Sequence, residues 1–123
     1  MKRSIRKILW GICLLSFLFV SACKEETKTC DIDNPLETID WLKQIKDYFE
    51  QNANPVGAQI IQYEYNGECV YWVDSCFGCA DNYIIVYNSQ QDTICEFGSI
   101  AGLNTCPDWD TEATNEVMLF DGT

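Results

Sequence analysis

Residues 59–73, QIIQYEYNGECVYWV, contain the strongest structural signal in this chain. Its two halves, residues 59–65 and 68–73, are rich in β-branched and aromatic residues, and they flank Asn66-Gly67, a dipeptide typical of a two-residue hairpin turn. Because side chains alternate between the faces of a strand, this turn brings four apolar residues onto one face, which we expect to be a core face. These residues are Ile61, Tyr63, Val70 and Trp72.

Two more strands are predicted downstream of the hairpin. Residues 82–87 and 93–97 are separated by the polar turn 88–91, which favours a second antiparallel pair. The tail, residues 111–123, is ambiguous, and a short strand over residues 117–120 is one interpretation of it.

A helix is predicted upstream of the hairpin, from Asn34 to Gln51. Asn34 suits the N-cap, Pro35 suits the first helical position, and Glu37 gives the spacing of a capping box. Five apolar side chains recur on one helical face. They are Ile39, Trp41, Leu42, Ile45 and Phe49. The sequence therefore predicts an α+β domain, in which one N-terminal helix packs on an antiparallel β-meander of about four strands stapled by disulfides.

The N-terminus has the pattern of an exported protein. Basic residues within the first seven positions precede an uncharged apolar run over residues 8–20, and small residues follow. The run is shorter than the roughly 20 residues that a spanning helix needs, so a cleaved signal peptide over residues 1–22 is favoured over an uncleaved anchor. The residues Val20-Ser21-Ala22-Cys23 resemble a bacterial lipobox, which implies cleavage before Cys23 and its lipidation. Residues 23–29 are then a lipidated tether, and residues 30–123 a single domain.

The chain beyond the signal peptide is strongly acidic. Four lysines oppose 19 acidic residues there, so the formal charge of residues 23–123 is −15. Such a surface repels phosphate backbones, and we expect no nucleic-acid partner. Attachment to an anionic membrane is then expected through acyl chains rather than through a basic patch. The chain contains no histidine, which excludes Ser-His and Cys-His nucleophilic catalysis, and we expect no cofactor.

Six cysteines follow Cys23, and their even number in an exported domain predicts a disulfide framework of open connectivity. They are Cys30, Cys69, Cys76, Cys79, Cys95 and Cys106. The Cys76-Phe77-Gly78-Cys79 spacing is also that of a thiol–disulfide exchange site. Such a site needs a low thiol pKa, and the acidic neighbours Asp74 and Asp81 raise it. A structural disulfide role is therefore favoured.

The chain from about Cys30 to Asp108 resembles a group of small Bacteroidetes lipoproteins that share a domain of unknown function. Several short pieces carry the resemblance: Tyr63-Glu64-Tyr65-Asn66-Gly67, Val70-Tyr71, Cys76 with Cys79, Ile94-Cys95, the loop 98–102 and Cys106-Pro107-Asp108. Members of the group often have the two paired cysteines adjacent, and Cys69 looks like an additional one. The resemblance implies secretion, lipidation and one domain, and it implies no activity.

These observations favour a non-enzymatic binding or interaction module, anchored by lipid to the outer membrane and facing the periplasm or the cell surface. A glycan, a peptide or an envelope protein is the expected partner. Thiol–disulfide exchange at Cys76 and Cys79 is one alternative, and a small inhibitor that presents the loop 98–107 is another. Aromatic side chains anchor many partners, and we expect contacts from Tyr71, on the sheet face opposite the helix, and from Trp109, beside that loop.

Replacing the lipidation residue tests the predicted anchor. Wild-type protein made in a bacterial host is expected to incorporate labelled palmitate and to fractionate with membranes. The Cys23→Ala variant is expected to remain unlabelled and to leave the membrane fraction, because it lacks the acceptor sulfur. Unlabelled wild-type protein of full precursor length contradicts the prediction.

Overall fold

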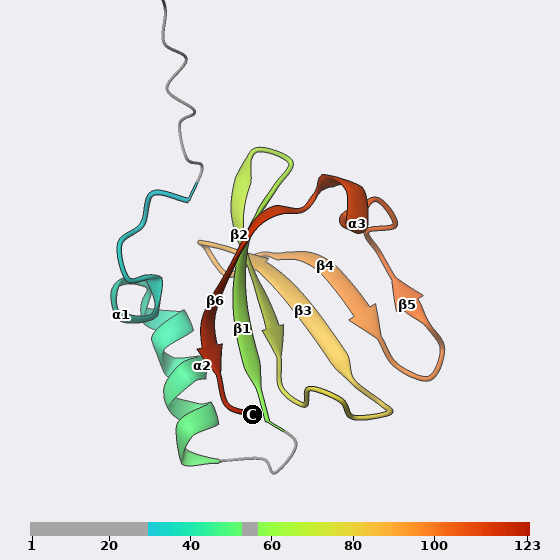
Figure 1. Ribbon diagram of the computed structural model, residues 1–123, viewed down its shortest axis with the longest axis horizontal. Coiled ribbons are helices and arrows are strands. Elements are labelled where there is room, and N and C mark those ends of the chain that lie inside the picture. The colour runs from blue at the N-terminus through green and yellow to red at the C-terminus, as the bar shows by residue number, and fades with distance from the viewer. Residues whose placement is uncertain (1–29, 53–56) are drawn as a thin grey trace, which may run out of the picture.

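The computed structural model describes residues 30–52 and 57–123, and the predicted signal peptide, tether and Cys23 lie outside them. Two helices precede an antiparallel sheet whose strands lie in the order β5-β4-β3-β2-β1-β6, and a third short helix precedes the last strand (Figure 1). The helices are α1 (Pro35–Thr38), α2 (Asp40–Gln51) and α3 (Trp109–Glu112). The strands are β1 (Gln59–Tyr65), β2 (Glu68–Asp74), β3 (Tyr83–Asn88), β4 (Thr93–Gly98), β5 (Leu103–Asn104) and β6 (Thr114–Asp121). The α+β class is confirmed.

The predicted central hairpin is confirmed. Strands β1 and β2 pair in register from Tyr65 opposite Glu68 to Gln59 opposite Asp74. Asn66 and Gly67 have φ angles of 48° and 77°, and a two-residue turn with both central residues at positive φ matches the twist of the strands it joins. The second predicted pair also forms, as β3 against β4.

The sheet has more strands than the four that the sequence predicts, because one strand is added at each edge. Strand β5 pairs with β4 through Phe97 and Gly98. Strand β6 resolves the ambiguous tail and pairs with β1, its non-sequential neighbour. The short strand suggested over residues 117–120 lies within β6, and the residues before it are polar and exposed, so the sequence does not predict the full length of the strand.

The predicted helix is divided in two at Ile39, whose backbone is extended. Asn34 adopts a left-handed conformation, with φ of 46°, and its side chain makes no capping hydrogen bond. The Thr38 hydroxyl donates instead to the Asn34 carbonyl oxygen (3.1 Å), a local bond that competes with helical continuation. The capping-box prediction is therefore wrong. No helix among the described residues has the length and hydropathy needed to cross a membrane.

Helix α2 covers the sheet face that carries Tyr71, and the expectation that Tyr71 is exposed is wrong. Tyr71 is 0% exposed and forms a core cluster with Leu42 of α2 and Ile60 of β1. The Trp41 ring meets the Tyr71 ring edge-on, with 5.9 Å between centroids. The four hairpin residues predicted to share a face do share it, but the helix packs against the other one.

A second core cluster lies on the face opposite α2, and Trp109 is at its centre. The Trp109 ring lies 5.0 to 5.6 Å, centroid to centroid, from the rings of Tyr63, Tyr65, Trp72 and Phe97. Only 8% of Trp109 is exposed. The prediction of Trp109 as a surface contact is therefore wrong, because α3 folds over the sheet and turns this side chain inward.

The disulfide framework is confirmed, as three pairs formed by the cysteines from Cys30 onward. Cys30–Cys69 ties the segment before α1 to β2, and Cys76–Cys79 closes a turn after β2. Cys95–Cys106 joins β4 to the residues just before α3. Because Cys95 is fully buried and Trp109 follows Cys106 closely, this last bond fastens α3 over the aromatic cluster.

Removing the Trp109 side chain is expected to destabilise the domain. Truncation of a buried tryptophan to alanine costs about 3–5 kcal/mol. Thermal denaturation should show the melting temperature of Trp109→Ala falling by more than about 10 °C, at roughly 4–8 °C per kcal/mol for a domain of this size. Phe77→Ala is the matched control, since Phe77 is 49% exposed and should change the melting temperature little. Equal melting temperatures of the two variants would place Trp109 outside the core.

The disulfides are expected to differ in their effect on stability. On loop-closure entropy alone, the pairs separated by 39, 11 and 3 residues contribute about 4, 3 and 2 kcal/mol respectively. Cys95→Ser/Cys106→Ser also places two hydroxyls in the core, so urea denaturation should show a larger loss of stability for it than for Cys76→Ser/Cys79→Ser. Equal losses from these two double variants would show that Cys95–Cys106 has no special role in the core.

Candidate functional site

A groove runs between α2 and the sheet face that α2 covers. It encloses about 440 Å³, within the usual range for small-molecule sites. Its lining is Trp41, Gln44, Ile45, Tyr48, Phe49, Val73, Ser75, Tyr83, Ile85, Tyr87 and Gln91. None of these side chains is charged, although the domain around them is strongly acidic.

The periodicity of two elements places the aromatic walls of the groove. On α2, Trp41, Gln44 and Tyr48 follow one another at spacings of three and four residues, so they share one face of the helix. On β3, Tyr83 and Tyr87 are separated by an even number of residues and therefore point to the same side of the sheet. The groove is thus the edge of the contact between α2 and the sheet, where the helix no longer covers β3.

The floor of the groove is held in place by hydrogen bonding and ring packing. The Trp41 Nε1–H donates to the Ser89 carbonyl oxygen (2.9 Å), and the Trp41 ring meets the Tyr87 ring edge-on at 5.4 Å. The Tyr83 hydroxyl donates to Glu96 Oε1 (2.6 Å), and this bond raises the pKa of Tyr83 above its ordinary value. Burial raises the pKa of Tyr87 in the same direction. Both hydroxyls therefore remain protonated donors at neutral pH.

The rim of the groove is accessible to solvent. Tyr48 is 63% exposed and Tyr83 is 40% exposed, one on each side. The lining offers aromatic rings, hydroxyls and two side-chain amides, and it has no carboxylate, amine or thiol. These groups can stack on and hydrogen-bond an uncharged molecule.

A smaller hollow of about 200 Å³ lies between α3 and β6, on the opposite face of the sheet. Its lining is Tyr63, Trp109, Asp110, Ala113 and Glu116. The Tyr63 hydroxyl donates to Glu116 Oε2 (3.0 Å), and burial together with this bond raises the pKa of Tyr63 to about 12. The hollow therefore combines two aromatic rings with two carboxylates. Trp109 contributes to it although most of its surface is buried in the core.

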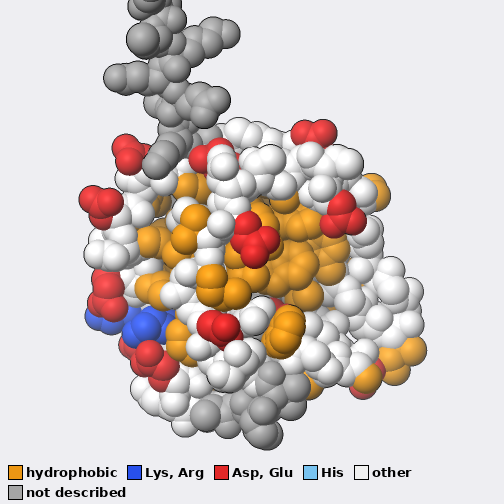
Figure 2. All heavy atoms as spheres, viewed as in Figure 1, with side chains coloured by type: hydrophobic (Ala, Val, Ile, Leu, Met, Phe, Trp, Pro, Cys, Tyr) orange, Lys and Arg blue, Asp and Glu red, His pale blue; other side chains and the backbone are white. Residues whose placement is uncertain are grey.

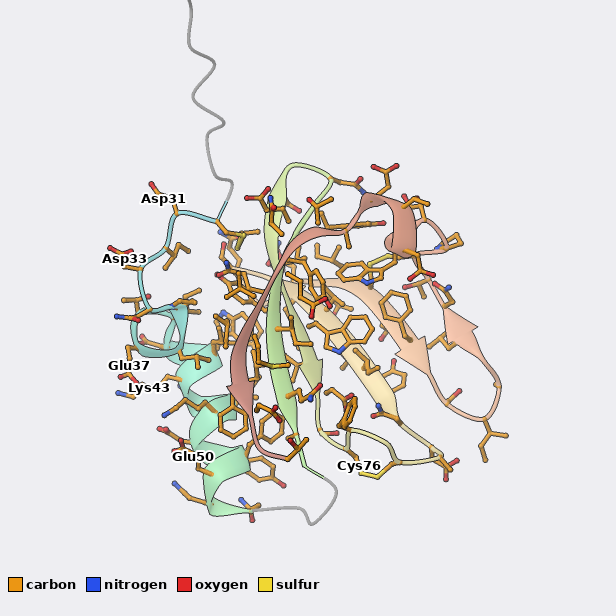
Figure 3. The ribbon with its side chains drawn as sticks, in the orientation of Figure 1. Asp31, Asp33, Glu37, Lys43, Glu50 and Cys76 are labelled. Atoms are coloured by element: carbon orange, nitrogen blue, oxygen red, sulfur yellow. A yellow bond between two sulfur atoms is a disulfide. The ribbon has the colours of Figure 1, made fainter. Side chains whose placement is uncertain are left out.

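The Cys76–Cys79 turn lacks the surroundings of a redox site. The Cys76 N–H donates to Asp74 Oδ1 (2.9 Å), so an almost fully buried carboxylate lies beside the pair. Strand β3 follows the turn, and no helix begins there. Figure 3 shows Cys76 at one end of the sheet and Lys43 on the outer side of the helices. Lys43 and Lys46, both on α2, are the only basic side chains among the described residues. No cation there stabilises a thiolate at this turn.

The structure also describes the loop over residues 98–107 and the arrangement of the acidic and cysteine side chains. The loop proposed for an inhibitor contains β5, and its Ile100 is 88% exposed. Within residues 30–52 and 57–123, no group of three or more acidic or cysteine side chains is arranged to hold a metal ion.

The sequence assigned the groove residues to other roles. The sequence predicts Trp41 as part of the apolar stripe of the helix, and tyrosines such as Tyr83 and Tyr87 are common in strands. The available signal was the recurrence of aromatic residues at both Tyr83 and Tyr87. It could not be recognised without knowing that α2 covers this face only partly.

Comparison with known proteins gives one family. No curated protein and no solved structure shows significant similarity to the chain. The family described as a domain of unknown function, DUF6970, matches residues 46–122, which include the C-terminal half of α2, the hairpin and all of the remaining sheet. The match covers more than half of the chain, and the chain therefore belongs to the DUF6970 family.

Proposed function

We propose that this protein is a non-enzymatic binding module of the bacterial cell envelope, lipidated at Cys23, that holds an uncharged glycan in the groove between α2 and β3. The N-terminal sequence and the resemblance to Bacteroidetes lipoproteins support attachment to the outer membrane. The observation that supports the ligand assignment is the absence of any charged side chain from the groove lining.

The shape and polarity of the groove suit a sugar. A pyranose ring has an apolar C–H face that packs on aromatic rings, and hydroxyls around its edge that need hydrogen-bond partners. Tyr48 and Tyr83 provide rings at the rim, and Gln44 and Gln91 provide amides that both donate and accept. An anionic sugar would find no counterion in the groove and would meet an acidic surface outside it.

The groove also suits binding better than transformation. Hydrolysis of a glycosidic bond needs two positioned carboxyl groups flanking the bond. The groove lining contains none, and Glu96, which accepts from Tyr83, lies outside the lining. The site therefore offers contacts for recognition without an acid–base pair.

Titration with oligosaccharides tests this function. Purified protein, as processed by a bacterial host, is titrated with a panel of neutral tetrasaccharides and with charged oligogalacturonate, while NMR follows the indole N–H signals. A neutral sugar is expected to shift the Trp41 signal saturably, and oligogalacturonate is not. Failure of every neutral sugar to shift it, or equal shifts with the charged one, would contradict the proposal.

Variants at the rim sharpen the same test. Tyr48→Ala removes an exposed ring from the groove, and we expect it to weaken sugar binding about tenfold, consistent with about 1 kcal/mol or more for ring stacking. Phe77→Ala is the matched control, because it removes another exposed ring that does not line the groove. Both variants should keep the wild-type melting temperature. Equal weakening by both would contradict the assignment of the groove.

A further inference from the structure

The sheet face opposite α2 is only partly covered. Figure 2 shows hydrophobic side chains gathered over β1 to β4 on this face, with carboxylates around them. Trp72 and Phe97 stack there with 5.2 Å between centroids, and both remain partly exposed. Helix α3 has only four residues, and it shields the cluster around Trp109 but not the rest of the face. We call this surface, built around Trp72, Phe97 and the hollow between α3 and β6, the aromatic face.

The carboxylates at the hollow have no cationic partner. Asp110 makes no hydrogen bond or ion pair within the described part of the chain, and Glu116 accepts from the Tyr63 hydroxyl through Oε2. The lysines of the described residues are both on α2. Lys43 pairs with Glu37, and Lys46 pairs with Asp47 and Glu50. The aromatic face therefore carries negative charge that no described residue neutralises.

Two carboxylates beside two aromatic rings fit an organic cation. A lysine ammonium or an arginine guanidinium can pair with Asp110 and Glu116, and it would also lie beside the ring of Tyr63, which is only partly buried. A bare metal ion is a poorer fit, because the hollow provides only two acidic ligands. The volume of about 200 Å³ accommodates the end of one such side chain.

We propose that the aromatic face docks a basic segment of a partner protein, with one lysine or arginine side chain in the hollow between α3 and β6 and apolar neighbours against Trp72 and Phe97. Charge complementarity identifies this occupant, since the face is apolar at its centre and acidic at the hollow. The site is separate from the glycan groove and on the other side of the sheet. It would give the module a second, positively charged ligand in addition to the uncharged glycan.

Titration with short synthetic peptides tests the proposal. The probe is a six-residue peptide in which leucine and lysine alternate, and one comparison peptide has glutamate in place of lysine. We expect the lysine peptide to shift the indole N–H signals of Trp72 and Trp109 and to leave that of Trp41 unchanged. Binding should weaken as salt rises from 0.1 to 0.5 M, on the order expected for screened charge pairs. No shift at Trp72 and Trp109, or equal shifts with the glutamate peptide, would overturn the proposal.

A charge-matched pair of variants separates specific docking from general attraction. Asp110→Asn/Glu116→Gln removes both charges of the hollow, keeps an acceptor for Tyr63, and should weaken the lysine peptide about tenfold or more. Asp31→Asn/Asp33→Asn removes the same charge from exposed positions beside α1, across the molecule from α3 (Figure 3), and should weaken it less than about twofold. Equal weakening by the two variants would overturn the proposal. Sugar binding at Trp41 is unaffected by either result, so the two functions can fail independently.

Discussion

Both faces of the β1–β2 hairpin carry large apolar side chains, and the described part of the chain has only one helix longer than four residues with which to cover them. The rest of the structure depends on this constraint. Tyr71 and Ile60 point to one face, and Trp72 and Tyr63 point to the other. Burying apolar surface is the dominant favourable term in folding, so a domain of this size must find a second cover from its remaining residues.

The second cover is α3, and a disulfide holds it against the sheet. A helix of four residues has almost no stability of its own, because nucleating a helical turn is unfavourable. Cys95–Cys106 holds the chain against β4 just before α3 begins, which fixes Trp109 over the sheet. The Tyr65 hydroxyl donates to Asp108 Oδ1 (2.6 Å) and fastens the same corner from the other side. Thus the Cys95–Cys106 disulfide and Trp109 allow a four-residue helix to cover this face.

The incompleteness of both covers explains where accessible aromatic surface remains. Helix α2 leaves the outer part of β3 open, which creates a groove with uncharged walls. Helix α3 leaves Trp72 and Phe97 partly exposed on the opposite face, beside the hollow with its carboxylates (Figure 2). Both surfaces are rich in aromatic side chains, and they differ in charge. Charge rather than hydrophobicity therefore separates the two ligand chemistries proposed for them.

The elements with local signals could be predicted from the sequence: the Asn66-Gly67 turn, the strands on either side of it, the second hairpin and the cysteines available for bridging. Which face α2 covers depends on tertiary packing, because a strand with apolar residues on both faces gives no preference between them. That choice buried Tyr71, and the pairing of Cys95 with Cys106 buried Trp109, so both predicted contacts became core residues. Strand β6 could be predicted only in part, as a short strand over residues 117–120, since its pairing with β1 joins residues 50 to 62 positions apart in the chain and its side chains are largely exposed.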